Sequence, residues 1–151
     1  MSRPMIDVEI ENKKLIAVLD TGSHRSYIRA EFVKDFPAAP VQPFHVKLGG
    51  EILNVKEGKF VSGIVTDSSG RRYRFSDVLF PVSDLGEENG KKIDLLFGAV
   101  NLEDWGTIID ESITPPRIDH RILRKGELVE LNNRVIKGAV FGKEERGFEA
   151  L

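Results

Sequence analysis

The first part of the chain alternates between apolar and polar residues in the manner of half-buried β-strands. Residues 6–10 place apolar side chains at every second position, and a polar turn follows at residues 11–14. Residues 15–19 are continuously apolar, which is typical of a strand that is buried on both faces. The pattern therefore predicts a hairpin that leads directly into the sequence Asp-Thr-Gly-Ser at residues 20–23.

A second hairpin is predicted over residues 44–48 and 51–55. The two glycines between these strands, Gly49 and Gly50, suit a two-residue turn of the primed type, which needs positive φ angles. In that register the apolar residues of the two strands face one another, except at the tip, where Leu48 lies opposite a glutamate.

A third hairpin is predicted from residues 60–66 and 71–82, around a polar turn at residues 67–70. The return strand begins with arginines that alternate with aromatic residues, so the two kinds of side chain lie on opposite faces. The first half of the chain is therefore expected to be a series of antiparallel hairpins.

The remaining elements up to residue 110 are short. Helical spacing of apolar residues predicts one short helix at 29–36, before two prolines, and another at 99–105. A polar loop is predicted at residues 84–92, and strands at residues 93–97 and 107–110.

The character of the chain changes after residue 110. A Pro-Pro pair at residues 115–116 interrupts it, residues 121–131 predict a hairpin that turns at Lys-Gly, and residues 142–151 are charged and expected to fray. We therefore expect a principal domain over residues 1–110. The C-terminal extension, residues 111–151, could contribute its hairpin to a dimer interface.

Composition narrows the possible functions. The chain has 151 residues, enough for one domain with a core of its own. The 22 Lys and Arg residues against 24 Asp and Glu residues give a net charge of −2, without the basic excess typical of nucleic-acid binders. There is no cysteine and there are three scattered histidines, so neither a thiol nucleophile nor a metal centre is expected. No apolar run approaches the ~20 residues that cross a membrane, and we expect a cytoplasmic protein.

Residues 20–23 are the clearest candidates for chemical activity in the sequence. A buried strand delivers the Asp20 carboxyl onto a tight glycine turn. If a second carboxylate faced it, the two could not both ionise and would share one proton, and such a pair can activate a water molecule. Thr21 is expected to brace the turn, Gly22 to allow close backbone approach, and Ser23 to hydrogen-bond the outer carboxylate oxygen.

The run at residues 19–28, Leu-Asp-Thr-Gly-Ser-His-Arg-Ser-Tyr-Ile, resembles the active-site sequence of retropepsin-like aspartic peptidases. It is most similar to the peptidase domain of Bel/Pao-type LTR retroelements. Two later landmarks of that family follow in the right order. The hairpin at residues 44–55 corresponds to the flap that closes over the substrate, and Leu96-Phe97-Gly98 corresponds to the apolar-apolar-glycine run that opens a short helix. The resemblance covers residues 5–110.

The resemblance implies an all-β, closed-barrel-like retropepsin fold with one or two short helices, assembled as a homodimer. It implies an endopeptidase without metal or organic cofactor, acting on an extended peptide on the acid side of neutral pH, with one Asp20 from each chain in the catalytic dyad. The site residues that it implies are Asp20, Thr21 and Gly22 for catalysis, Ser23, Leu48, Gly49 and Gly50 for substrate binding, and Gly98 as structural support.

Two alternatives remain open at this stage. The same dimeric fold could serve as a catalytically silent peptide-binding or assembly module. A nucleic-acid-associated accessory domain of a mobile element could instead use the arginines at 71, 72 and 74, although a solvated strand face is favoured for them. The chain also departs from retroviral enzymes after Gly98, where Ala99 stands in place of the usual arginine, so a dimer would need other ties.

Overall fold

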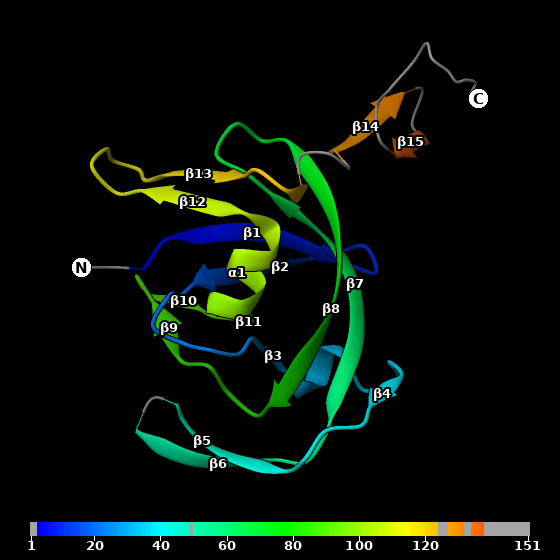
Figure 1. Cartoon of the computed structure of the whole chain (residues 1–151), viewed down its shortest axis with the longest axis vertical. Helices are drawn as coiled ribbons and strands as arrows, with labels where there is room; N and C mark the ends of the chain where they lie inside the picture. Colours follow the sequence, from blue (N-terminus) through cyan, green and yellow to red (C-terminus); the bar gives the residue numbers. More distant parts are fainter. Residues whose placement is uncertain (1–2, 49, 124–126, 132–133, 138–151) are drawn as a thin grey trace.

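The computed structural model describes residues 3–48, 50–123, 127–131 and 134–137. Six strands form a closed barrel in the hydrogen-bonded order β8-β3-β11-β2-β1-β7, and β7 pairs back onto β8 (Figure 1). The β2–β11 and β3–β8 pairs are parallel, and the other barrel pairs are antiparallel. The barrel strands are β1 (Met5–Ile10), β2 (Lys13–Leu19), β3 (Tyr27–Arg29), β7 (Gly58–Thr66), β8 (Arg72–Val82) and β11 (Leu95–Phe97). The predicted all-β, barrel-like architecture is confirmed.

The first hairpin, β1–β2, forms as predicted but with a tighter turn. Glu11 and Asn12 have positive φ angles of 50° and 67°, as the two central residues of a primed turn require. Lys13 and Lys14 therefore belong to β2 and pair with the end of β1. In this register Met5 lies opposite Val18, so the point at which the chain leaves β2 is set relative to β1.

The second hairpin has the predicted register. Strands β5 (Phe44–Leu48) and β6 (Glu51–Val55) form a separate two-stranded sheet that lies below the barrel in Figure 1. Gly50 has a φ of +86°, as expected at this turn, and Gly49 lies outside the described residues. We refer to this hairpin as the flap hairpin.

The core consists of two clusters on opposite sides of the barrel wall. The interior cluster includes an aromatic group in which the Phe97 and Trp105 ring centroids are 4.6 Å apart and both rings lie near Phe75. The second cluster lies outside the wall, where Val18 and Leu96 pack with apolar residues of the flap hairpin. Burial on both faces explains the continuous apolar run of β2, whose alternate side chains enter different clusters.

Two elements predicted before residue 93 differ from the structure. The helix predicted at residues 29–36 is only a 3-10 turn, η1 (Ala30–Phe32), because Tyr27–Arg29 is used as the barrel strand β3 between β11 and β8. The polar loop predicted at residues 84–92 contains a small hairpin of β9 (Glu87–Glu88) and β10 (Lys91–Lys92).

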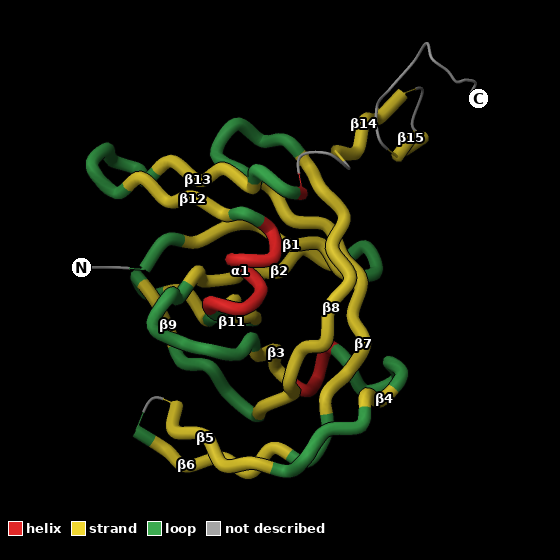
Figure 2. The backbone as a smooth tube through the Cα atoms, viewed as in Figure 1, coloured by secondary structure: helices red, strands yellow, loops and turns green. Residues whose placement is uncertain are grey.

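The helix predicted after the strand β11 is present as α1 (Ala99–Trp105), drawn red in Figure 2. It ends at Gly106, whose φ of 65° is the left-handed conformation that commonly terminates helices. The strand β12 (Thr107–Asp110) follows directly, as predicted. A short strand β4 (Ala38–Ala39) pairs with the edge of β7.

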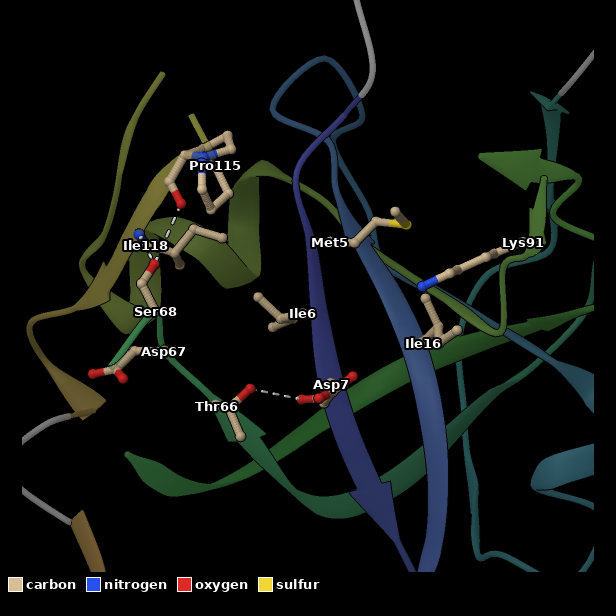
Figure 3. A pocket seen from close by; sticks show the side chains of 11 residues that line it. Met5, Ile6, Asp7, Ile16, Thr66, Asp67, Ser68, Lys91, Pro115 and Ile118 are labelled. Atoms are coloured by element: carbon tan, nitrogen blue, oxygen red, sulfur yellow. Dashed lines mark hydrogen bonds between the residues drawn. The ribbon is translucent and has the colours of Figure 1, made fainter. Parts of the chain in front are cut away.

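The chain beyond residue 110 folds back onto the barrel. Strand β13 (Arg117–His120) pairs with β12, and Ile118 is buried in the interior cluster. Figure 3 shows the neighbouring cavity, where the Ser68 hydroxyl donates a hydrogen bond of 3.4 Å to the carbonyl of Pro116 and accepts one from the Ile118 N–H. Residues on both sides of the predicted boundary at 110 therefore share one core.

The hairpin predicted at residues 121–131 is wrong in its pairing. Strand β14 (Glu127–Leu131) pairs with β15 (Arg134–Lys137) and with the start of β8. Residues 121–123 form a turn instead of a partner strand. The predicted turn at residues 125–126 and the C-terminal segment 142–151 lie outside the described residues.

His120 connects β13 to the rest of the fold. Its ring is fully buried, with Nε2–H donating to the Thr66 carbonyl at 3.0 Å and Nδ1 accepting from the Thr107 hydroxyl at 2.9 Å. Burial lowers the pKa of His120 below its usual 6.5, against the opposing effect of the Thr66 hydrogen bond. The folded state therefore favours the neutral imidazole.

This burial predicts a pH-dependent stability. The contribution of His120 is present above pH 6.5 and is lost as the pH falls through its lowered pKa, because the unfolded state then binds the proton more readily. We expect the free energy of unfolding, measured in urea, to fall between pH ~7 and ~5 and to fall less steeply in His120→Gln. His24→Gln, at an exposed histidine, should keep the wild-type slope. An identical slope in His120→Gln would contradict the assignment.

Candidate active site

Asp20 follows the last residue of β2 and continues the parallel pairing with β11. Its backbone N–H donates to the Phe97 carbonyl at 2.9 Å. The chain then turns sharply, because the Ser23 N–H donates to the Asp20 carbonyl at 3.1 Å and the Gly22 N–H donates to Asp20 Oδ1 at 3.0 Å. The carboxylate is thus fixed at the mouth of the barrel with a side chain that is 28% exposed.

The loop at residues 20–26 is bound to the start of helix α1. The Ala99 N–H donates to the Ser23 carbonyl at 2.7 Å, and the Val100 N–H donates to the His24 carbonyl at 3.1 Å. These two donors belong to the first turn of the helix, where backbone N–H groups have no partner within the helix. The helix and the loop therefore satisfy each other's backbone groups.

Gly98 lies at the closest approach between this loop and β11. A Cβ at residue 98 would be 2.3 Å from the carbonyl oxygen of Arg25 and 2.6 Å from that of Ser23. The Gly98 N–H also donates to the buried Ser26 hydroxyl at 2.9 Å. The glycine is required by the space available and not by a positive φ, since its backbone is extended.

Ser26 anchors the end of the loop. Its hydroxyl donates to the Asn101 side-chain oxygen on α1, and its carbonyl accepts from the Phe80 N–H at 3.0 Å. Both Ser26 and Asn101 are buried. The sequence alone assigns no role to this serine; the available signal is a hydroxyl directly before the apolar pair Tyr27 and Ile28.

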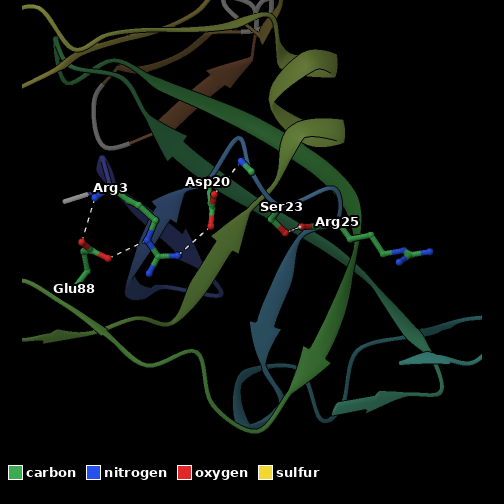
Figure 4. A network of polar contacts seen from close by, with 6 residues as sticks. Arg3, Asp20, Ser23, Arg25 and Glu88 are labelled. Atoms are coloured by element: carbon green, nitrogen blue, oxygen red, sulfur yellow. Dashed lines mark hydrogen bonds and ion pairs between the residues drawn. The ribbon is translucent and has the colours of Figure 1, made fainter. Parts of the chain in front are cut away.

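The structure also adds two charged residues to the site. An Arg3 guanidinium nitrogen, Nη1, lies 3.1 Å from Asp20 Oδ2, and Arg3 Nε lies 2.9 Å from Glu88 Oε1 (Figure 4). The Arg3 N–H donates to the other oxygen of Glu88 at 3.1 Å. These hydrogen bonds from Arg3 hold the pKa of Glu88 below its usual value.

Two features of the sequence could have indicated that Arg3 and Glu88 belong to the site. The β1–β2 register places Met5 opposite Val18, so two further residues toward the N-terminus bring Arg3 opposite Asp20. The Asn-Gly sequence at residues 89–90 is a strong signal for a tight hairpin, and both residues have positive φ. That hairpin carries Glu88.

Asp20 and Thr21 line a cavity of about 350 Å³. Its apolar wall includes Leu102 of α1 and Ile109 of β12, and Glu111 contributes a further carboxylate. None of the described flap residues lines this cavity. Within a single chain, the predicted site residues of the loop, 20–23, therefore lie together with Gly98. The predicted flap residues Leu48 and Gly50 lie apart from them.

The flap hairpin contacts the loop through Arg25 instead. The Arg25 guanidinium carbon lies 3.8 Å from the centre of the Phe44 ring, at the base of the flap hairpin. Phe44 in turn packs edge-on against Phe80 of β8, with ring centroids 5.2 Å apart. A cation above an aromatic face is attracted to the ring electrons, so Arg25 connects the loop to the flap hairpin.

Ser23 and Thr21 differ from the sequence-based expectation. The Ser23 hydroxyl donates to the Arg25 carbonyl at 2.9 Å and not to the Asp20 carboxylate, so it stabilises the turn. Thr21 is exposed, and in the described part of the chain its hydroxyl has no hydrogen-bond partner. A bracing role for Thr21 within one chain therefore has no support.

Three further observations on the described residues concern metal binding, membrane crossing and the arginine-rich face of β8. No group of three or more His, Asp or Glu side chains among them is arranged to hold a metal ion. No helix in the described segments is long and apolar enough to cross a membrane. On the arginine-rich face of β8, Arg72 forms a 2.7 Å ion pair with Glu9 of β1.

The lack of space around Gly98 predicts that an added methyl group destabilises the fold. In Gly98→Ala the Cβ meets backbone oxygens, which cannot move without shifting the loop, and we expect the free energy of unfolding to fall by about 3 kcal/mol. The control is Gly70→Ala, where φ is +83° and nothing lies within 4 Å, so only about 1 kcal/mol of backbone strain is expected. If urea titrations gave the two variants equal losses in the free energy of unfolding, the close approach of the loop carbonyls to residue 98 would not limit stability.

The chain has a structural likeness among solved structures but no match among family models or curated proteins. Among solved structures it is similar to one described as the solution structure of Simian Foamy Virus (mac) protease. The sequences are 16% identical, the TM-score is 0.37, and the match covers 66% of this chain and 91% of the other. Conclusions about function therefore depend on the residues of the chain itself.

Proposed function

We propose that this protein is an aspartic endopeptidase of the retropepsin type, in which two copies of the chain each contribute Asp20 to one catalytic dyad. The observation that carries this proposal is the placement of Asp20. It lies on a glycine turn at the end of a buried barrel strand, and its loop is fitted against Gly98 and bound to helix α1. A carboxylate held in this way is positioned for chemistry at low cost in entropy.

Two described aspartates of the same chain are poor candidates for the second carboxylate. Asp67 also begins a glycine-containing turn, but its oxygens accept hydrogen bonds from Ser69, from the Arg71 N–H and, at 2.6 Å, from the Tyr73 hydroxyl. Burial raises the pKa of Asp67, but the hydrogen bonds led by Tyr73 outweigh it and hold the pKa below its usual value. Asp67 is therefore a turn residue, permanently ionised near neutral pH.

The half-buried carboxyl of Asp77 is also excluded as the second member. It accepts a hydrogen bond of 3.2 Å from the Trp105 ring N–H, and it interacts with Asn101 on the same helix. Burial raises the pKa of Asp77. Its partners are core residues of α1, so it supports the helix. A two-fold dimer places identical residues opposite each other, so we propose the Asp20 of a second chain as the partner carboxylate.

The proposed chemistry follows from the pairing. Two facing carboxylates hold one proton and bind a water molecule between them. The ionised Asp20 removes a proton from this water, which attacks the peptide carbonyl carbon, while the neutral Asp20 protonates the carbonyl oxygen. Collapse of the tetrahedral intermediate breaks the C–N bond: the leaving nitrogen takes the proton of one Asp20, and the other Asp20 accepts a hydroxyl proton from the intermediate, which restores the shared proton.

An extended peptide is the substrate that this architecture suits. Strand-like ligands bind by adding to existing β-structure, and alternate side chains enter pockets. The flap hairpin offers half-buried apolar residues, including Val46, Leu48 and Leu53, and its Ile52 is 73% exposed near the tip. We propose that these residues contact the substrate when the flap hairpin closes.

The alternatives differ in what they require. A silent peptide-binding module of the same fold does not need Asp20, so the intact site favours the enzyme. A nucleic-acid module needs accessible cations, and Arg72 of the basic cluster is already paired with Glu9.

The decisive experiment is digestion of a diverse peptide library at pH ~4–6, the range in which a dyad that shares a proton works. We expect cleavage by the wild type and none by Asp20→Asn, which keeps the size of the side chain and removes its charge. Cleavage by both proteins would contradict the assignment of Asp20. If neither cleaves while the wild type is dimeric, the binding module becomes the better description.

The stacking contact predicts a separate effect on substrate binding. Arg25→Ala removes the cation from the Phe44 ring, which loosens the base of the flap hairpin, and we expect KM to rise about threefold with a smaller change in kcat. Arg25→Lys should restore most of the loss, since it keeps the charge. Arg74→Ala, on the exposed face of β8, is the control and should leave KM unchanged. A fall in kcat at constant KM would argue against this role.

A further inference from the structure

Arg3 occupies a position that the proposed dyad needs. In the single chain Asp20 Oδ1 accepts the Gly22 N–H, and Oδ2 is paired with the Arg3 guanidinium at 3.1 Å (Figure 4). Arg3 is also held by Glu88, whose side chain is only 15% exposed. The catalytic candidate is therefore already paired with a cation from its own chain.

This pairing conflicts with the catalytic arrangement. In the proposed dyad the two aspartates face each other and hold one proton between them, which requires an accessible oxygen on each carboxyl. Arg3 also lies against the oxygen that would otherwise be free to receive a proton or a water molecule. The two partners of Asp20, Arg3 and the second Asp20, are therefore alternatives.

We propose that Arg3 is an inhibitory latch, held by Glu88, that must leave Asp20 before the active dimer can form. The inference rests on the proposed function and concerns the regulation of the same site. Glu88 supplies a second carboxylate for the guanidinium, so Arg3 does not become an unpaired charge when it leaves Asp20.

The surrounding geometry allows the side chain to leave without disturbing the strand. The Leu19 N–H donates to the Pro4 carbonyl at 2.9 Å, which fixes the backbone next to Arg3. The Arg3 side chain is 34% exposed and borders the cavity that also contains Glu111. A change of rotamer is therefore enough to release Asp20.

The test measures association and cleavage separately. Arg3→Gln removes the cation, and we expect about tenfold tighter dimerisation by sedimentation equilibrium, since two partly exposed ion pairs no longer have to be broken in each dimer. Activity per chain at low protein concentration should rise with it. Arg3→Lys should stay near the wild type in both measurements. Arg72→Gln is the matched control, because it removes a cation paired with Glu9 away from the site.

The outcomes separate the latch from the proposed function. Unchanged or weaker dimerisation in Arg3→Gln, with cleavage still dependent on Asp20, overturns the latch alone. Tighter dimerisation without any cleavage supports the latch and counts against the peptidase. If wild type and Arg3→Gln both remain monomeric at high concentration, the dyad is excluded and the latch with it.

Discussion

The site depends on the close approach of two strand ends. Because β2 and β11 are parallel neighbours, Leu19 lies beside Phe97 and the chain leaves both strands at the same edge of the barrel. Only a residue without a side chain at position 98 leaves room for the carbonyls of the neighbouring loop. The hydrogen bonds between that loop and α1 then fix the backbone of Asp20. One steric constraint thus determines where the carboxylate stands.

Electrostatics set a second requirement. In one chain Arg3, which lies just before β1, is the charged partner of the Asp20 carboxylate. The same carboxylate in a dimer would face its symmetry mate. Under our proposal, Asp20 therefore has two alternative partners of opposite charge. The flap hairpin contacts the same loop through Arg25 and Phe44, so the proposed association and substrate binding both involve this loop.

The sequence predicted most of the hairpins because they have clear alternation and well-matched turns; the register of the flap hairpin around Gly50 is an example. It failed where tertiary pairing decided the outcome. Residues 29–36 have helical spacing, but the barrel takes Tyr27–Arg29 as a strand. Strand β14 pairs with β15, which follows it, and with the start of β8; local patterns could not identify the pairing with β8, which is distant in the chain. For the site, the motif indicated Asp20, whereas Arg3 became visible only through the register of β1 and β2.

The central claim is that one active site is built from two chains, and a mixing experiment tests it most directly. Wild-type protein at fixed concentration is titrated with Asp20→Asn while peptide cleavage is followed. If each dyad needs Asp20 from both partners, the variant captures wild-type chains in inactive heterodimers, and activity falls as the fraction of wild-type chains falls. Activity that stays constant across the titration, although mixed dimers form, would contradict the account.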